Sequence, residues 1–212
     1  EFRRVLFRSG SAVLGLGNIG PEAALPVMEG KAALFKRFAD VDAWPVCLDT
    51  QDVDEIVRTV QILAPVYGGI NLEDISAPRC FEVERRLRDL LDIPVFHDDQ
   101  HGTAVVVLAA LTNALKLVKK NLKDCKIVMS GVGAEGTAIA RLLVASGAKN
   151  IIGYDKDGLV CDHKPGDDLV RTWFVDNCSP GSFKGDIHEA IKGADIFIGV
   201  SAPNILNEEE DR

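Results

Sequence analysis

The chain has 212 residues, of which 47 % are hydrophobic and 26 % are charged, with 19 glycines and 9 prolines. This globular composition suits one large domain or two small ones, and it excludes collagen, coiled coils, low-complexity disorder and disulfide miniproteins. The net charge of −8 disfavours nucleic-acid binding, and the absence of an uninterrupted apolar run of about 18 residues argues against a membrane span.

The first nine residues, EFRRVLFRS, differ in character from the rest of the chain. They are basic and lack the apolar region of a signal peptide. We interpret residues 1–9 as a non-native junction and leave them out of the predicted fold. The chain also stops soon after its last predicted strand, so we expect it to be incomplete at both ends.

Strands and helices alternate along the rest of the chain. Short apolar runs predict strands at 12–14, 46–48, 67–72, 94–96, 126–129, 151–154 and 196–200. Helices are predicted at 21–38, 52–63, 78–91, 103–118 and 134–145, with two more near Leu169 and Ala190. The helix at 103–118 is apolar almost throughout, so we expect it to be buried. This alternation predicts an α/β fold with parallel sheets.

The five cysteines do not form a recognisable metal or disulfide pattern. Their number is odd and none lies in a CxxC spacing. This favours reduced, mostly buried thiols in a cytoplasmic protein.

One glycine-rich turn has the features of a dinucleotide-binding loop. Residues 126–138 contain a strand, the pattern GxGxxG and the start of a helix. Gly131 permits a tight turn, Gly133 lets the backbone approach a pyrophosphate, and Gly136 allows close helix–strand packing. Asp155 ends the next strand about 20 residues later, where an acid binds the ribose hydroxyls. A tight turn in another α/β fold is the alternative.

The same loop bears on the choice of cofactor. We include Ala134 and Glu135, at the start of the helix, among the expected cofactor-binding residues. Asp155 favours NAD, because a carboxylate repels a 2′-phosphate, but Lys156 could accept that phosphate, so NADP stays possible. A second GxGxxG at 15–20 lacks a matching acid at a strand end, and we interpret it as a turn of the preceding domain.

Adjacent carboxylates follow two neighbouring predicted strands. Glu73 and Asp74 follow one, and Asp98 and Asp99 follow the next. Ligands bind at the carboxyl ends of parallel strands, and four carboxylates there would repel one another without a cation such as Mg²⁺ or Mn²⁺. Helix N-caps at Asp74 and Asp99 are an equally good interpretation.

Three further polar residues lie near these segments. His97 and His101 could bind a metal, although such residues more often cap and pack. Lys31 stands between Gly30 and small apolar residues. Burial and a nearby cation would favour its neutral amine, as a general base requires, whereas a carboxylate would oppose it. A surface lysine is the alternative.

Four segments together resemble the bacterial-type malic enzymes. They are VLGLGNIGP at 13–21, MEGK at 28–31, GGINLED at 68–74 and FHDDQHGTA at 96–104. The resemblance runs from about Ser11 to Leu206. It implies that Lys31 is the general base, that Asp98 hydrogen-bonds and tunes this lysine, and that Glu73, Asp74 and Asp99 are metal ligands.

The resemblance implies oxidative decarboxylation of L-malate to pyruvate and CO₂, with NAD or NADP as cofactor and Mg²⁺ or Mn²⁺ as metal. It divides the chain into a substrate and metal domain at 10–97 and a Rossmann-like domain at 98–212, both incomplete, from a homo-oligomeric parent. Neither Tyr67 nor Tyr154 matches the family's general acid, so we expect this chain to be weak or inactive alone. A non-catalytic dinucleotide-binding module and a metal-independent, amino-acid-dehydrogenase-like oxidoreductase are the alternatives.

Overall fold

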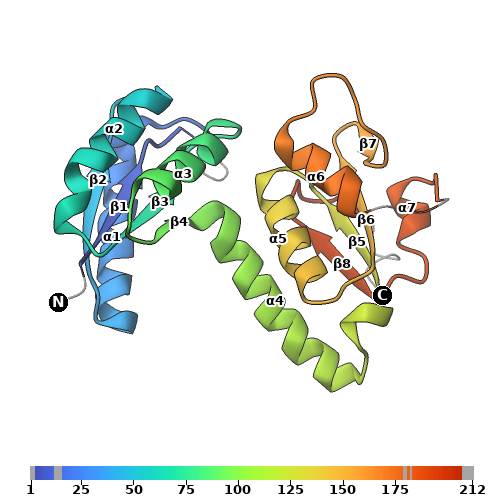
Figure 1. The fold of residues 1–212 in the computed structure, drawn as a ribbon. Coiled ribbons are helices and arrows are strands. Elements are labelled where there is room, and N and C mark those ends of the chain that lie inside the picture. The colour runs from blue at the N-terminus through green and yellow to red at the C-terminus, as the bar shows by residue number, and fades with distance from the viewer. Residues whose placement is uncertain (1–2, 12–15, 179–180, 182, 207–212) are drawn as a thin grey trace. The chain divides into compact units, whose positions relative to one another are not determined.

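The computed structural model describes residues 3–11, 16–178, 181 and 183–206 (Figure 1). Its contacts divide the chain into two units, Glu1–Asp99 and Gln100–Arg212, close to the boundary that we expect after residue 97. Each unit contains one four-stranded sheet. The α/β class predicted from the alternating pattern is therefore confirmed.

The sheet of the first unit is parallel throughout, in the order β2-β1-β3-β4. Its strands are β1 (Arg3–Arg8), β2 (Asp42–Cys47), β3 (Gly69–Glu73) and β4 (Val95–His97). Its helices are α1 (Gly20–Ala39), α2 (Val53–Leu63) and α3 (Arg79–Leu90), with a 3₁₀ turn η1 (Ala64–Val66). The strand that we predict at 12–14 lies outside the described residues.

Strand β1 corrects our exclusion of residues 1–9 from the fold. It pairs with β2 on one side and β3 on the other, inside the sheet. Val5 and Phe7 join the cluster formed with α2 and α3, and Leu6, which points to the opposite face, is also fully buried. A continuous apolar triplet, buried on both faces of the sheet, forms a good inner strand whatever the origin of its residues.

The sheet of the second unit has the order β7-β6-β5-β8, with only β7 antiparallel. Its strands are β5 (Lys126–Ser130), β6 (Asn150–Asp155), β7 (Gly158–Leu159) and β8 (Ile196–Gly199). The helices are α4 (Asp98–Val118), α5 (Ala134–Ala145), α6 (Leu169–Asn177) and α7 (Ile187–Ala190), with a 3₁₀ turn η2 (Leu122–Asp124). The two-residue strand β7 is too short to leave an apolar pattern in the sequence.

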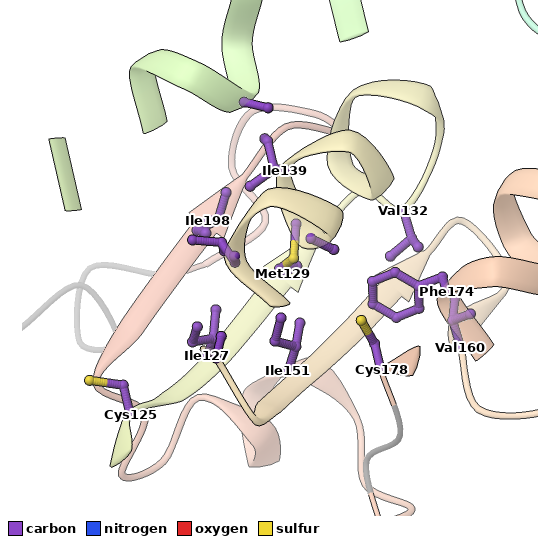
Figure 2. Packing of buried hydrophobic residues seen from close by; sticks show 14 residues of the cluster. Cys125, Ile127, Met129, Val132, Ile139, Ile151, Val160, Phe174, Cys178 and Ile198 are labelled. Carbon is purple, nitrogen blue, oxygen red and sulfur yellow. The ribbon is translucent and has the colours of Figure 1, made fainter. Parts of the chain in front are cut away.

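Side chains from the sheet and from α5 and α6 form the core of this unit (Figure 2). Ile127 and Met129 of β5 lie between Ile139 of α5 and Ile151 of β6, and all four are at most 2 % exposed. Phe174 of α6 closes the same cluster. This core holds the turn between β5 and α5 in place.

Helix α4 is mostly exposed, so the expectation that this segment is buried is wrong. Only one stripe of a helix can face a single core; the residues packed there are Ala104, Val107, Leu108, Leu111 and Leu115. The large apolar side chains of α4 that are exposed lie in two pairs, Val105 and Val106 in its first half and Leu117 and Val118 at its end. By length and composition alone, this helix could cross a membrane, contrary to our expectation from uninterrupted runs. Length and composition are weak evidence for a membrane span, because core helices of water-soluble proteins can be equally long and apolar.

Candidate active site

The four predicted carboxylates come together at one edge of the first sheet. Glu73 ends β3 and Asp74 follows it, while Asp98 and Asp99 open α4 directly after β4. Because β3 and β4 pair in parallel, their carboxyl ends lie at the same edge. Arg8 ends the neighbouring strand β1, in register with Glu73.

Lys31 reaches this edge from α1. Its Nζ donates hydrogen bonds to Glu73 Oε2 at 2.7 Å and to Asp98 Oδ2 at 2.6 Å. The lysine side chain is 18 % exposed, so the alternative of a solvated surface lysine is wrong. Burial alone would lower the pKa of Lys31, but the hydrogen bonds and charges of Asp98 and Glu73 outweigh it and raise the pKa. Lys31 is therefore a charged ammonium in this arrangement.

Asp99 is the carboxyl group at this edge whose ionisation is opposed, first by burial and then by the neighbouring charge of Asp98. Burial and the neighbouring charge of Asp98 raise the pKa of Asp99 to about 6, although Lys31 and Arg8 oppose the shift. Its Oδ2 accepts a hydrogen bond from the Asp74 backbone N–H at 2.8 Å. A carboxyl group that resists ionisation marks a place where additional positive charge would be favourable.

Asp74 is held through both its backbone and its side chain. Its φ of 50° is left-handed, a conformation that aspartate tolerates better than most residues. The hydroxyls of Ser9 and Ser11 donate to its carbonyl oxygen, each at 3.2 Å. Its carboxylate forms an ion pair with the Arg8 guanidinium.

The helix-cap interpretation of these acids is wrong. Pro78 occupies the N-cap position of α3, without a capping side chain, so Asp74 does not cap that helix. Asp99 lies inside the first turn of α4, and the hydrogen bond that it accepts comes from Asp74. Both acids therefore belong to the cluster at the strand edge and do not cap a helix.

The donor atoms suit Mg²⁺ or Mn²⁺, but their present arrangement does not form a coordination shell. Glu73, Asp74 and Asp99 offer hard oxygen ligands at one edge. Asp74 Oδ2 is buried and, within the described structure, is the oxygen paired with the Arg8 guanidinium. Over those same ranges, no group of three or more His, Cys, Asp or Glu side chains could hold a metal ion as placed. Lys31 pairs with Glu73 and Asp98, and Arg8 pairs with Asp74.

His97 adds no ligand to this set. It is 1 % exposed, and its Nδ1 lies 4.0 Å from Asp99 Oδ2. This position fits the packing role that we favour for the histidines of this segment.

The glycine turn of the second unit has the geometry that its pattern predicts. Gly131 has a φ of 103°, and its N–H donates to Tyr154 O at 2.8 Å. A Cβ on Gly136 would stand under 3.0 Å from the Gly131 carbonyl group, whereas a Cβ on Gly133 would meet nothing within 4 Å. The first and third glycines thus allow close packing, and the second leaves open space at the start of α5.

A cavity of about 420 Å³ lies beside this turn, within the size range of small-molecule sites. Gly133, Asp155, Lys156 and Arg171 are among the residues that line it. The Asp155 carboxylate is bound by the Nη1 group of Arg171, and its other oxygen accepts the Asp157 N–H at 2.8 Å. Gly133, expected at a pyrophosphate, and Asp155, expected at a ribose, therefore face one cavity, whereas the other expected cofactor-binding residues, Gly131, Ala134, Glu135 and Gly136, are not among those that line it.

Arg171 is a site residue that the sequence reasoning missed. It comes from α6, and its Nε also lies 2.9 Å from Asp167 Oδ1. The sequence contains no spacing rule that links an arginine on this helix to the acid at the end of β6. Only the packing of α6 beside the turn brings the two side chains together.

A lysine among carboxylates at a parallel strand edge, and a glycine turn facing an acid in a second α/β unit, define a class of dinucleotide-dependent oxidoreductases. Comparison with known families specifies the class further. Residues 2–88 match the malic enzyme N-terminal domain, and residues 100–210 match the malic enzyme NAD-binding domain. The chain belongs to the malic enzyme family.

Individual relatives agree with this assignment. The chain is 58 % identical over 201 residues to an NAD-dependent malic enzyme of Geobacillus stearothermophilus, covering 95 % of this chain and 42 % of that protein. It is 46 % identical to an NADP-dependent malic enzyme of Salmonella typhimurium, covering 95 % of this chain and 26 % of that protein. A crystal structure of an NAD-dependent malic enzyme from Thermotoga maritima superposes with a TM-score of 0.92 at 48 % identity, covering 99 % of this chain and 56 % of that one. The chain thus spans about half or less of each relative.

Proposed function

We propose that this chain supplies the substrate and dinucleotide-binding parts of an enzyme that oxidatively decarboxylates L-malate to pyruvate and CO₂ while reducing NAD or NADP. One observation carries the proposal: Lys31 lies between Glu73 and Asp98 at the strand edge of a malic enzyme N-terminal domain. Family membership removes the amino-acid-dehydrogenase-like alternative. From composition and resemblance, we further propose a cytoplasmic, homo-oligomeric enzyme.

Glu73, Asp74 and Asp99 would hold Mg²⁺ or Mn²⁺ at this edge. When bound, the ion supplies a Lewis acid beside the malate oxygens. The acids must first turn away from their present partners, since Glu73 accepts a hydrogen bond from Lys31 and Asp74 is paired with Arg8.

Lys31 would accept the proton of the malate hydroxyl. The amine must be neutral for this step, and the two carboxylates beside it now stabilise the charged form. Turning Glu73 away removes one hydrogen bond and one nearby negative charge, so the pKa of Lys31 falls toward the range of a general base. Asp98 remains as the hydrogen-bond partner that orients Nζ and can receive its proton at 2.6 Å.

The glycine turn and Asp155 would bind the dinucleotide. The open space at Gly133 and the N-terminus of α5, where Ala134 and Glu135 begin the helix, suit the pyrophosphate. Asp155 suits the ribose hydroxyls, and Gly133 and Asp155 line the same cavity. The hydride acceptor is thus NAD, with NADP as the second possibility.

The test is malate-dependent formation of reduced cofactor, followed at 340 nm in the presence of Mn²⁺, with pyruvate measured as the second product. We expect a slow rate that Lys31→Ala abolishes. Lys36→Ala provides the matched control, because Lys36 lies on the same helix, is 57 % exposed and pairs with Asp40 and Asp42. Because we expect this chain to be weak or inactive alone, the decisive case is the chain extended at both ends with the sequence of a full-length relative. Binding of NAD by that protein without any turnover would refute the proposal in favour of a non-catalytic dinucleotide-binding module.

A further inference from the structure

A permanent positive charge is built into the strand edge where the divalent cation would bind. Arg8 is the last residue of β1, and its side chain is 2 % exposed. Its guanidinium forms an ion pair with Asp74, one of the three proposed metal ligands. Because β1 is hydrogen-bonded on both sides, the backbone of Arg8 is fixed at this position.

The surroundings of Arg8 do not satisfy its hydrogen-bonding groups. Its Nε and Nη1 are buried and have no hydrogen-bond partner among the residues that the structure describes. A guanidinium carries five N–H donors, and a buried charge with unpaired donors is unfavourable. The Asp74 carboxylate is therefore the main compensation for burying this charge.

The same pairing engages three of the four carboxylates at this edge with cationic side chains. Lys31 binds Glu73 and Asp98, and Arg8 binds Asp74. Of the proposed ligands, Asp99 alone is not engaged by one of these two cations. The edge thus carries two cationic side chains where a loaded metal site would carry one ion and the catalytic lysine.

We propose that Arg8 competes with Mg²⁺ or Mn²⁺ for Asp74 and thereby weakens metal binding in this chain. This inference rests on the proposed function, because it takes Asp74 as a metal ligand. A guanidinium stays protonated in proteins, so the competition cannot be relieved by a change of pH. Two like charges on one carboxylate in a buried place repel strongly. A small neutral residue at position 8 would leave Asp74 free for the ion.

Calorimetric titration with MnCl₂ tests the inference on the 212-residue chain. We compare the parent with Arg8→Ser and with Arg85→Ser, which removes the same charge from a 64 % exposed side chain on α3. Arg8→Ser should bind Mn²⁺ at least about ten-fold more tightly, and Arg85→Ser should match the parent. Adding Glu73→Ala to Arg8→Ser should abolish this gain in Mn²⁺ affinity.

Thermal unfolding with and without Mn²⁺ keeps the test decisive if Arg8→Ser folds poorly. Ligand binding to the folded state raises the melting temperature, so the rise caused by Mn²⁺ should be larger in Arg8→Ser than in the parent. Arg8→Met, which keeps the length of the apolar stem, should show the same larger rise.

Equal Mn²⁺ affinities in the parent and both Arg8 variants would overturn the inference. If the parent also bound Mn²⁺ in a manner that depends on Glu73, the metal site of the proposed function would stand. If neither the parent nor any variant bound Mn²⁺, the inference about Arg8 and the proposed metal site would both fail. Loss of folding in both Arg8 variants without rescue by Mn²⁺ would show that Arg8 has a structural role only, and would also overturn the inference.

Discussion

Replacing Gly136 by alanine should destabilise the second unit, and the structure gives both the reason and the size of the effect. The new Cβ would stand 2.9 Å from the Gly131 carbonyl carbon and still nearer to its oxygen. Gly131 cannot easily move away, because it has a φ of 103° and its N–H is bonded to Tyr154 O. Overpacking against a fixed backbone costs up to about 3 kcal/mol.

Helix propensity offsets part of this cost. Gly136 lies within α5, and alanine favours a helix over glycine by up to about 1 kcal/mol. The expected net loss is about 2 kcal/mol of unfolding free energy. For a unit of this size, that corresponds to a fall in melting temperature of roughly 10 °C.

Gly133→Ala is the matched control. Gly133 has a φ of −78° and a ψ of −156°, which alanine adopts readily, and its Cβ would meet nothing within 4 Å. We expect little change in stability but at least about ten-fold weaker NAD binding, because the methyl group fills the space proposed for the pyrophosphate. The pair thus separates the packing role of one glycine from the binding role of the other.

Urea unfolding followed by tryptophan fluorescence can isolate the second unit. The chain has two tryptophans: Trp173 packs against the core of the second unit, and Trp44 is 66 % exposed in the first. In a Trp44→Phe background, the signal comes from Trp173 alone. If Gly136→Ala unfolds at the same urea concentration as the parent, the close approach to Gly131 does not constrain the turn and the reasoning is refuted.

Three further predictions concern single side chains. Asp99→Asn should stabilise the metal-free protein by up to about 1 kcal/mol above pH 6, allowing for partial exposure. The raised pKa of Asp99 means that its ionisation lowers the unfolding free energy as pH rises from about 3.8 to about 6. Unfolding free energies measured by urea titration across this pH range should show that decrease in the parent and not in the variant. Tyr154→Phe should cost about 1 kcal/mol, measured as a lower melting temperature, because the hydroxyl donates its one proton to the backbone carbonyl oxygens of Gly185 and Asp186, which lie within hydrogen-bond distance; an unchanged value would contradict this. Arg171→Leu should weaken NADP binding about ten-fold relative to NAD, since Asp155 would lose its counter-charge. Equal losses of affinity for both cofactors in binding titrations would refute this role of Arg171 in cofactor choice. Arg171→Lys should retain the parent's ratio of NADP to NAD affinity.

Much of the fold could be predicted because local patterns decide it. The parallel strands of both units follow short apolar runs, and the close contact at Gly136 follows from the third glycine of its motif. The acids at 73–74 and 98–99 follow strands that pair as neighbours, so their gathering at one edge follows from the parallel topology.

The features that could not be predicted depend on contacts between distant segments. Strand β1 is basic in composition, and only its continuous apolar triplet, Val5 to Phe7, fits an inner strand. The hydrogen bonds of Lys31 join α1 to residues about 40 and 70 positions away. The sequence does not show that two carboxylates lie beside its Nζ and together raise the pKa of Lys31. The pairing of Arg171 with Asp155 likewise depends on how α6 packs.

The exposed apolar side chains of α4 have a practical consequence for work with this chain. Val105, Val106, Leu117 and Val118 are each more than half exposed, and apolar surface of this kind drives molecules together in water. Light scattering and sedimentation should therefore depend on protein concentration, with association weakening as the solution is diluted. Binding titrations are best performed in dilute samples, where self-association does not compete with the ligand.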